Sequence, residues 1–283
     1  MSSTHGDAAG TLYVVATPIG NLDDLSPRAR QLLARADIIA AEDTRRTGRL
    51  LSSIAVKRRL IAYHEHNEKT QTPKLVEKML RGASVALVSD AGVPLLSDPG
   101  LVLVRAARES GLAVVAVPGP SSITAALSIA GLPTDRFAFE GFLPRRKGLL
   151  ERRLKALRTE PRTMVLFEAV HRLPATVDAL VDHFGEDRPA AIAREITKLH
   201  EQSVVGSLGD IRARLGKDIP LRGEFVLLVG GCSASPAGDE TEARRIFELL
   251  SDEVGPKRAV ELAAKIAGLP RNEVYRQTRQ RKP

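Results

Sequence analysis

Short runs of aliphatic and β-branched residues alternate with amphipathic stretches along the first 130 residues. Such runs are typical of buried strands, and the stretches between them carry apolar residues at helical spacing. Capping residues followed by proline mark helix starts at Ser26-Pro27, Thr72-Pro73 and Asp98-Pro99. Five strands separated by helices predict a mostly parallel, helix-covered sheet. The predicted strands are 12–16, 37–41, 59–63, 85–89 and 112–117, and a helix over 122–130 ends this part.

The next part of the chain has five predicted strands but only three helices, which indicates a second α/β domain with a mixed sheet. The boundary between the two domains is expected near 119–122. The predicted strands are 137–141, 163–167, 188–194, 202–205 and 224–229, and the helices lie near 146–158, 171–183 and 208–215.

The last 43 residues predict three short helices, over 242–250, 256–266 and 271–280. A tight turn with Gly268 followed by a basic helix resembles a helix-turn-helix, although a small helical appendage packed on the main body is the alternative. The chain is therefore divided into a flexible N-terminal tail (1–10), an N-terminal α/β domain (11–120), a C-terminal α/β domain (121–231), a linker (232–240) and a helix-turn-helix-like segment (241–283).

Composition narrows the class of protein. With 283 residues, 43% hydrophobic and 27% charged, the chain resembles an ordinary soluble globular protein. Its one cysteine, Cys232, excludes a disulfide framework and a multi-cysteine zinc site, and it suits a reducing compartment. The apolar runs are too short to cross a bilayer and the first ten residues lack a signal pattern, so we expect a cytoplasmic protein without a membrane partner.

The formal net charge of +8 is concentrated in two segments. Residues 145–158 carry seven basic side chains and one acid, and residues 271–282 carry five and one. Local basicity of this kind favours a nucleic acid as partner, whereas a solvated helix face is the plainer interpretation. Seven Phe, three Tyr and no Trp argue against stacking on an aromatic platform. The residues expected to contact RNA phosphates are Arg145, Arg146, Lys147, Arg152, Arg153, Arg271, Arg276 and Arg279.

Polar, glycine-rich loops follow several predicted strands, at the edge where open α/β sheets bind ligands. None contains GxGxxG or a Walker A sequence, which disfavours a dinucleotide-type Rossmann site and phosphate transfer from ATP. The densest loop, 89–100, has two Asp, two Gly, two Pro and two Ser, and therefore predicts an unusual backbone path close to a ligand. His64 and His66 are too weakly spaced to predict a metal site, so no metal is expected.

Eight motifs in fixed order resemble the tetrapyrrole methylase superfamily and, within it, the ribosomal RNA small subunit methyltransferase I branch. The resemblance covers about residues 11–230, and the C-terminal helical segment matches that branch as well. The motifs are TPIGNL, AEDTR, SDAGVPLLSDPG, PGPSS, EGFLPRRKG, FEAVHRL, REITKLHE and RGEFVLLV. Ile123, after PGPSS, stands where many relatives of the wider family have a small residue.

The resemblance implies two α/β domains with S-adenosylmethionine in the cleft between them, as in class III methyltransferases. It also implies a homodimer and 2′-O-methylation of a cytidine ribose, cytidine 1402, in the decoding region of 16S rRNA or the small ribosomal subunit. The cofactor-binding residues carried over from the motifs are Pro18, Ile19, Gly20, Ser89, Asp90, Ala91, Gly92, Ser121, Ser122, Phe167, Glu168, Ala193, Gly223 and Glu224.

Methyl transfer to a hydroxyl requires in-line positioning and gains from a base or a charged neighbour. The catalytic candidates are Asp43, Glu42, Arg45 and His64, of which Asp43 is preferred because it lies in a short polar motif at a strand tip. Structural ion pairs or phosphate contacts are the alternative roles of these residues. Two other functions stay open: C-methylation of a tetrapyrrole, and RNA binding without catalysis. Other charged residues considered are Glu195, Glu201, Arg172, Arg194 and Lys198.

Overall fold

A computed structural model describes residues 10–232 and 240–279 of the chain. Residues 10–154 and 163–230 form one compact unit, and residues 155–162, 231–232 and 240–279 belong to a second. The expected N-terminal tail and linker lie outside the described residues, apart from Gly10, Cys232 and Glu240. No helix in the described ranges is both long and apolar enough to span a membrane.

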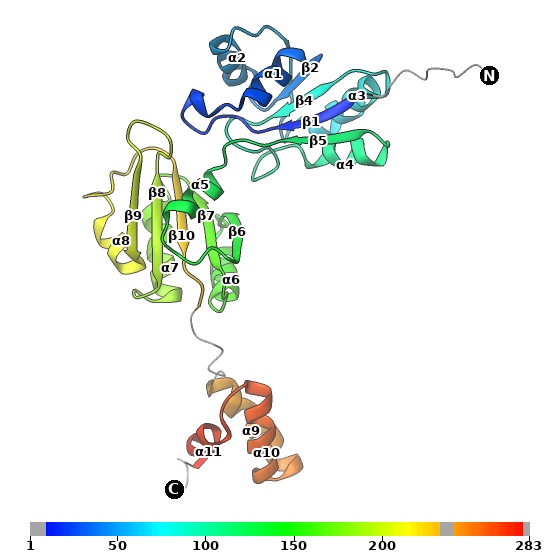
Figure 1. The fold of residues 1–283 in the computed structure, drawn as a ribbon. Helices are drawn as coiled ribbons and strands as arrows, with labels where there is room; N and C mark the ends of the chain where they lie inside the picture. The colour runs from blue at the N-terminus through cyan, green and yellow to red at the C-terminus, as the bar shows by residue number, and fades with distance from the viewer. Residues whose placement is uncertain (1–9, 233–239, 280–283) are drawn as a thin grey trace, which may run out of the picture. The chain divides into compact units, whose positions relative to one another are not determined.

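The first domain of the larger unit is a five-stranded sheet in the order β3-β2-β4-β1-β5, with every pairing parallel (Figure 1). Its strands are β1 (Thr11–Val15), β2 (Ile38–Ala41), β3 (Arg59–Ala62), β4 (Val85–Val88) and β5 (Ala113–Val117). Its helices are the 3-10 turn η1 (Leu22–Asp24), α1 (Pro27–Arg35), α2 (Thr44–Ser53), α3 (Glu68–Leu80) and α4 (Leu101–Glu109).

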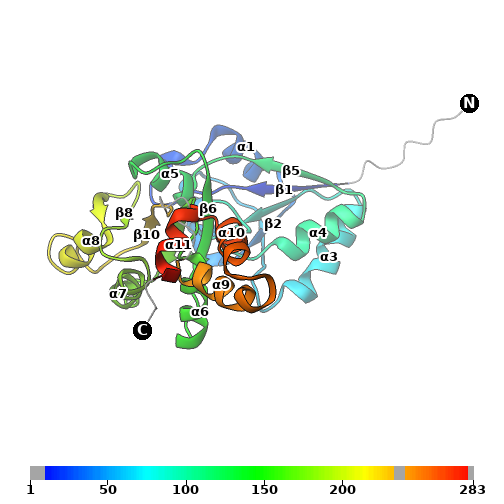
Figure 2. The same ribbon diagram turned by 90° about the horizontal axis from the view of Figure 1, so that it is seen from below.

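Helices cover both faces of this sheet, because parallel strands joined by crossover helices are buried on two sides. One face packs residues such as Leu12 and Leu87 against Leu75 of α3 and Leu103 of α4. On the opposite face, Ile39 and its neighbours pack against α1 and α2. Figure 2 shows α3 and α4 side by side. The outcome is that the loops at the carboxyl ends of β1, β2 and β4 gather at one edge, where a site can form.

The second domain contains a mixed sheet in the order β6-β7-β10-β8-β9, in which β6 and β7 are parallel and the other pairs antiparallel. Helix α5 packs on one face, against residues such as Val165 and Val226, while α7 lies on the other face (Figure 2). The elements are α5 (Ser122–Ile129), β6 (Phe137–Phe142), α6 (Lys147–Leu157), β7 (Thr163–Glu168), α7 (Leu173–Phe184), β8 (Pro189–Arg194), β9 (Gln202–Ser207), α8 (Leu208–Arg214) and β10 (Phe225–Val229).

Three helices form the core of the smaller unit: α9 (Glu240–Val254), α10 (Pro256–Ala267) and α11 (Arg271–Arg279). Ile246, Val260 and Val274, one from each helix, are buried together. Gly268 adopts a left-handed conformation (φ +65°) that ends α10, as glycine does at this position of many helices. The expected fold class, two α/β domains with a small helical C-terminal segment, is confirmed.

Two expected helix starts were wrong. Helix α3 begins at Glu68 and contains Pro73. Thr72 does not cap a helix, because its hydroxyl hydrogen-bonds to the buried Tyr63 hydroxyl (2.9 Å). Helix α4 begins at Leu101, with Gly100 rather than Asp98 preceding it. The Asp98 side chain therefore does not cap this helix.

Candidate functional site

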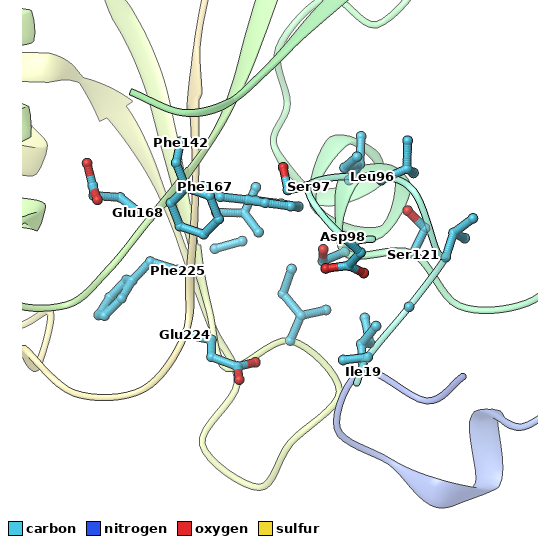
Figure 3. Close-up of a pocket in the computed structure, with 18 of the residues that line it drawn as sticks. Ile19, Leu96, Ser97, Asp98, Ser121, Phe142, Phe167, Glu168, Glu224 and Phe225 are labelled. Carbon is cyan, nitrogen blue, oxygen red and sulfur yellow. The ribbon is translucent and has the colours of Figure 1, made fainter. Parts of the chain in front are cut away.

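A cavity of about 350 Å³ opens between the strand-end loops of the first domain and the sheet of the second domain (Figure 3). This volume lies in the range of small-molecule sites. Apolar side chains make up most of its wall, with a few polar groups among them. The lining residues are Ile19, Ala91, Gly92, Val93, Leu96, Ser97, Asp98, Ser121, Ser122, Ile123, Phe142, Phe167, Glu168, Ala169, Ala193, Ile196, Gly223, Glu224, Phe225 and Val226.

The loop from Ser89 to Gly100 builds one wall of the cavity. Leu95 and Ser97 have positive φ angles (+76° and +67°), and Gly92 and Gly100 do as well. Such angles are uncommon for residues with a side chain and tend to occur at functional sites. Gly92 also pairs through its backbone with Thr17, which ties this loop to the loop after β1. The unusual backbone path expected for this loop is confirmed.

Aromatic rings from the second domain form the facing wall. Phe167 of β7 makes edge-to-face contacts with Phe139 and Phe142 of β6, with ring centroids 5.0 and 5.7 Å apart. A bulge at Glu140 shifts the register of β6, and Gly141 (φ +61°) passes close to Ser97 of the opposite wall. The rings thus present a fixed apolar surface at the point where the two domains meet.

A charged cluster lies around Glu224, at the edge of the facing wall. Lys198 Nζ donates to Glu195 Oε1 (2.8 Å) and to Glu224 Oε2 (3.0 Å), and the Glu224 backbone N–H donates to Glu195 Oε1 as well (2.9 Å). The bond from Lys198 lowers the pKa of Glu195. Gly223, at φ +93°, passes so close to Glu195 that a Cβ would lie 2.5 Å from its carboxyl carbon. These contacts fix the backbone of Gly223 and Glu224 along the cavity.

Glu168, at the end of β7, is the most buried acid of the cavity wall. Its side chain is 1% exposed and accepts hydrogen bonds from the Thr176 hydroxyl (2.6 Å) and the Ala169 N–H (2.8 Å). Arg172 lies 3.5 Å away and also donates to the Leu143 carbonyl (3.0 Å). The carboxylate is therefore fully paired, and the pair joins α7 to the segment that follows β6.

Ten of the fourteen expected cofactor residues line this one cavity, although they come from six separate stretches of chain. The other four, Pro18, Gly20, Ser89 and Asp90, do not line it. Gly20 instead allows close approach of Thr197 and Lys198, since a Cβ there would lie 2.5 Å from Lys198 Cγ. The Asp90 carboxylate accepts a hydrogen bond from the Asp43 N–H (3.0 Å) and so joins the loops that follow β4 and β2.

The motif comparison missed half of the cavity wall. Asp98 and Phe142 lie in motifs that the sequence analysis quoted, and a closer inspection of those motifs could have singled them out. The remaining residues are apolar or small and carry no chemical signal of their own. The missed residues are Val93, Leu96, Ser97, Asp98, Ile123, Phe142, Ala169, Ile196, Phe225 and Val226.

None of the four catalytic candidates lines the cavity. Asp43 is the N-cap of α2, and its carboxylate binds the Arg45 backbone N–H and guanidinium (both 2.8 Å). The hydrogen bond from Arg45 lowers the pKa of Asp43, which makes this carboxylate a poor base. The structure therefore does not favour Asp43 as the base, and the Arg45 guanidinium is already bound to the Asp43 carboxylate.

Glu42 follows β2 and His64 follows β3, and Glu42 is near enough to the cavity residue Asp98 to influence its pKa. Burial raises the pKa of Glu42, and its Oε2 accepts a long hydrogen bond from the Asp90 N–H (3.2 Å). His64 Nδ1 is buried without a hydrogen-bond partner in the described structure. The His64 and His66 rings lie 5.9 Å apart, and no group of three or more potential metal ligands occurs among the described residues.

The basic residues expected to contact RNA differ in their surroundings. Arg145, Arg146, Lys147 and Arg152 are exposed and form no ion pair with any described residue. Arg153 instead binds Glu140, whose side chain is only 8% exposed, so the structure gives it a role in the fold. In the smaller unit, Arg276 lies 3.7 Å from Glu273, Arg271 is exposed, and the Arg279 side chain lies outside the described residues.

Known proteins share this fold. The family model Tetrapyrrole (Corrin/Porphyrin) Methylases matches residues 11–212. The methyltransferase CobJ is 20% identical, with a TM-score of 0.60 over 80% of this chain and 95% of that one. A uroporphyrin-III C-methyltransferase from Thermus thermophilus, complexed with S-adenosylhomocysteine, is 20% identical, with a TM-score of 0.53 over 78% and 97%. The chain therefore belongs to the tetrapyrrole methylases, a family of S-adenosylmethionine-dependent methyltransferases.

Closer relatives define the branch of this family. The protein called Ribosomal RNA small subunit methyltransferase I in Xylella fastidiosa is 48% identical over 94% of this chain and 98% of its own. The protein of that name in Pseudomonas aeruginosa is 46% identical over 97% and 98%. A second family model, RsmI C-terminal HTH domain, matches residues 237–280. The chain belongs to this ribosomal RNA methyltransferase branch, as its motifs suggested.

Proposed function

We propose that this protein transfers a methyl group from S-adenosylmethionine to the ribose 2′-hydroxyl of one cytidine in the decoding region of 16S rRNA. The observation that carries the proposal is the convergence of ten expected cofactor residues on one cavity, in a chain whose relatives are named for the small-subunit rRNA. Cytidine 1402 is the target that the resemblance implies.

The cavity has the chemistry that this cofactor requires. Its apolar wall, with Phe167 and Ile196, suits the adenine ring and the thioether carbons, and its volume suits one molecule of this size. Elsewhere in the cavity wall, Ser121 precedes helix α5, and its side chain makes no capping hydrogen bond. The first amide groups of α5 are therefore available to the cofactor carboxylate, which the helix dipole also favours.

The bound cofactor would supply an electrophilic methyl group on a sulfonium. The protein's part in such a reaction is largely positioning, because the attacking oxygen must lie in line with the bond that breaks. Phe142 and Phe167 make the facing wall apolar, and the loop around Ser97 forms the opposite side. The residues proposed to hold the adenosine part are Phe167, Glu168, Ala193, Gly223 and Glu224, and those near the methionine part are Ile19, Ala91, Gly92, Ser121 and Ser122.

The direct test is methyl transfer from labelled S-adenosylmethionine to small ribosomal subunits and to naked 16S rRNA. Label that resists alkaline cleavage at one cytidine would support the proposal and identify the form of the substrate. Cofactor binding without labelled RNA would contradict it, and label on a tetrapyrrole instead would favour C-methylation. Absence of cofactor binding would leave a non-catalytic RNA-binding protein.

The basic residues at the start of α6 form the proposed RNA surface in the larger unit. Replacing Arg145, Arg146 and Lys147 together with alanine should lower the affinity for 16S rRNA by tenfold or more at moderate salt. The slope of log K against log salt should become shallower by about 0.7–0.9 for each phosphate that the variant no longer neutralises. Titrations by filter binding at several salt concentrations measure both quantities.

The matched control removes the same charge from α1, where Arg28, Arg30 and Arg35 are also exposed. If both triple variants change the slope equally, the effect reflects net charge, and the surface at the start of α6 is not the binding site. Equal affinity of the α6 variant and the wild type would exclude it as well.

The remaining expectations follow from the same proposal. We place the protein in the cytoplasm, as rRNA is its proposed substrate. The homodimer implied by the resemblance stays a prediction, and sedimentation equilibrium of the purified protein tests it.

A further inference from the structure

Asp98 lies on the cavity wall that is formed by the loop between β4 and α4. Figure 3 shows it on the cavity side of this loop, across the space from Phe142 and Phe167. The adjacent backbone is held in an unusual conformation, with Ser97 at φ +67° and Gly100 at φ +135°. Since α4 begins only at Leu101, the Asp98 carboxylate does not cap that helix. A side chain placed in this way is free to act on a ligand.

The surroundings of Asp98 leave its charge without a counterion in the described structure. The nearest charged groups are carboxylates, Glu42 at the end of β2 and Asp90 at the end of β4. Arg46 of α2 forms a salt bridge with Asp90 (3.4 Å). The nearby His64, after β3, partly offsets the rise in the pKa of Glu42. Burial, followed by repulsion from Glu42, raises the pKa of Asp98 to about 6, although a hydrogen bond with Ser89 acts in the opposite direction.

The other carboxylates of the cavity wall are already paired. Glu168 binds Thr176 and Arg172, and Glu224 binds Lys198. Asp98 is the third carboxylate of the lining and has no ion pair with any described residue. A carboxylate that is half-buried, without a counterion and close to two other acids binds a proton more readily than an ordinary aspartate, which suits it to proton transfer near neutral pH.

We propose that Asp98, on the cavity wall and without an ion pair in the described structure, is the general base that accepts the proton of the attacking ribose hydroxyl. This inference rests on the proposed function. As the oxygen–carbon bond forms, the methyl carbon–sulfur bond breaks and its electron pair neutralises the sulfonium. The hydroxyl proton moves to Asp98 Oδ and is later released to water. The products are the 2′-O-methylated ribose, neutral S-adenosylhomocysteine and a protonated Asp98.

The test compares Asp98→Asn with the wild type in three measurements. Single-turnover methyl transfer to small subunits should fall by about 10²–10⁴-fold, the usual contribution of a general base. Affinity for S-adenosylhomocysteine, measured by calorimetry, should stay within about threefold, because the amide keeps the shape of the side chain. The wild-type kcat/KM should rise about tenfold from pH 5 to pH 7, and the variant should lose this dependence.

Stability supplies a readout that does not require turnover. The folded protein binds the Asp98 proton more tightly than the unfolded chain, whose carboxyl has a pKa near 3.8, so ionised Asp98 destabilises the fold. Wild-type stability should therefore fall between about pH 4 and pH 6 relative to Asp98→Asn, and the variant should be the more stable of the two at pH 8. The exposed Asp135→Asn is the matched control, with no change expected.

The outcomes separate this inference from the function on which it rests. If the wild type labels RNA and Asp98→Asn labels it within fivefold of the same rate, the general-base role is wrong while the function stands. A loss of S-adenosylhomocysteine affinity that equals the loss of rate would make Asp98 a cofactor ligand instead. A wild type that binds S-adenosylhomocysteine but labels no RNA would overturn both.

Discussion

Replacing Arg172 with methionine should destabilise the protein by about 3–5 kcal/mol, the typical cost of leaving a buried charge without its partner. The Glu168 side chain is 1% exposed and that of Arg172 is 18% exposed, so water cannot take the place of the guanidinium. The substitution also removes the hydrogen bond from Arg172 to the Leu143 carbonyl. Urea unfolding of the two proteins at one pH measures the difference, with an unchanged m-value expected.

Two further variants make this prediction specific. Arg212 pairs with Glu186 on the surface, where the side chains are 40% and 63% exposed, and Arg212→Met should cost less than about 1 kcal/mol. In a Glu168→Gln background, Arg172→Met should be less damaging by at least about 1 kcal/mol, since no buried charge is then stranded. Equal costs in both backgrounds would show that the salt bridge contributes nothing beyond packing.

Substituting Gly223 with alanine should weaken S-adenosylhomocysteine binding at least about tenfold, or 1.4 kcal/mol. Gly223 lines the cavity at φ +93°, and the added Cβ would lie 2.5–2.6 Å from three atoms of the Glu195 side chain. Relief of that clash must move Glu195, whose carboxylate binds both Lys198 and the Glu224 N–H. Calorimetric titration of the folded variant measures the effect on the cavity.

A second glycine separates the clash from backbone strain. Gly111 also has a positive φ (+71°), but nothing lies within 4 Å of the position its Cβ would take. Gly111→Ala should therefore cost about 1–2 kcal/mol in stability, the penalty for a left-handed alanine, with no change in binding. If Gly223→Ala binds S-adenosylhomocysteine as tightly as Gly111→Ala does, the Glu195 cluster is not needed to shape the cavity.

The motifs predicted half of the cavity wall, because part of its chemistry is local. The loop from Ser89 to Gly100 needs glycine at two of its positive φ angles, and such residues are visible in a sequence. Arg153 could not be interpreted in the same way. An exposed arginine in a basic segment looks the same whether it faces RNA or binds Glu140, and only the fold of β6 beside α6 distinguishes the two.

The sequence pointed to Asp43 as the catalytic acid and did not single out Asp98. Both residues lie in polar motifs that come after strands of the parallel sheet, so the sequence alone does not show how their side chains differ. Their difference is in their neighbours: Asp43 is ion-paired with Arg45, whereas Asp98 faces Glu42 from another strand end. Side-chain pKa values depend on groups within a few ångströms, and these come from distant parts of the chain.

The order of residues along this chain determined the strands, most of the helices, the two α/β domains and the family, because periodicity, capping residues and ordered motifs are properties of neighbouring residues. The tertiary structure alone decided which acids are paired, which arginines bind acids within the fold and which side chains face the cavity. Those properties depend on which loops and strand ends the fold brings together, and residues as far apart in the sequence as Ser97 and Gly141 approach each other only when the chain has folded.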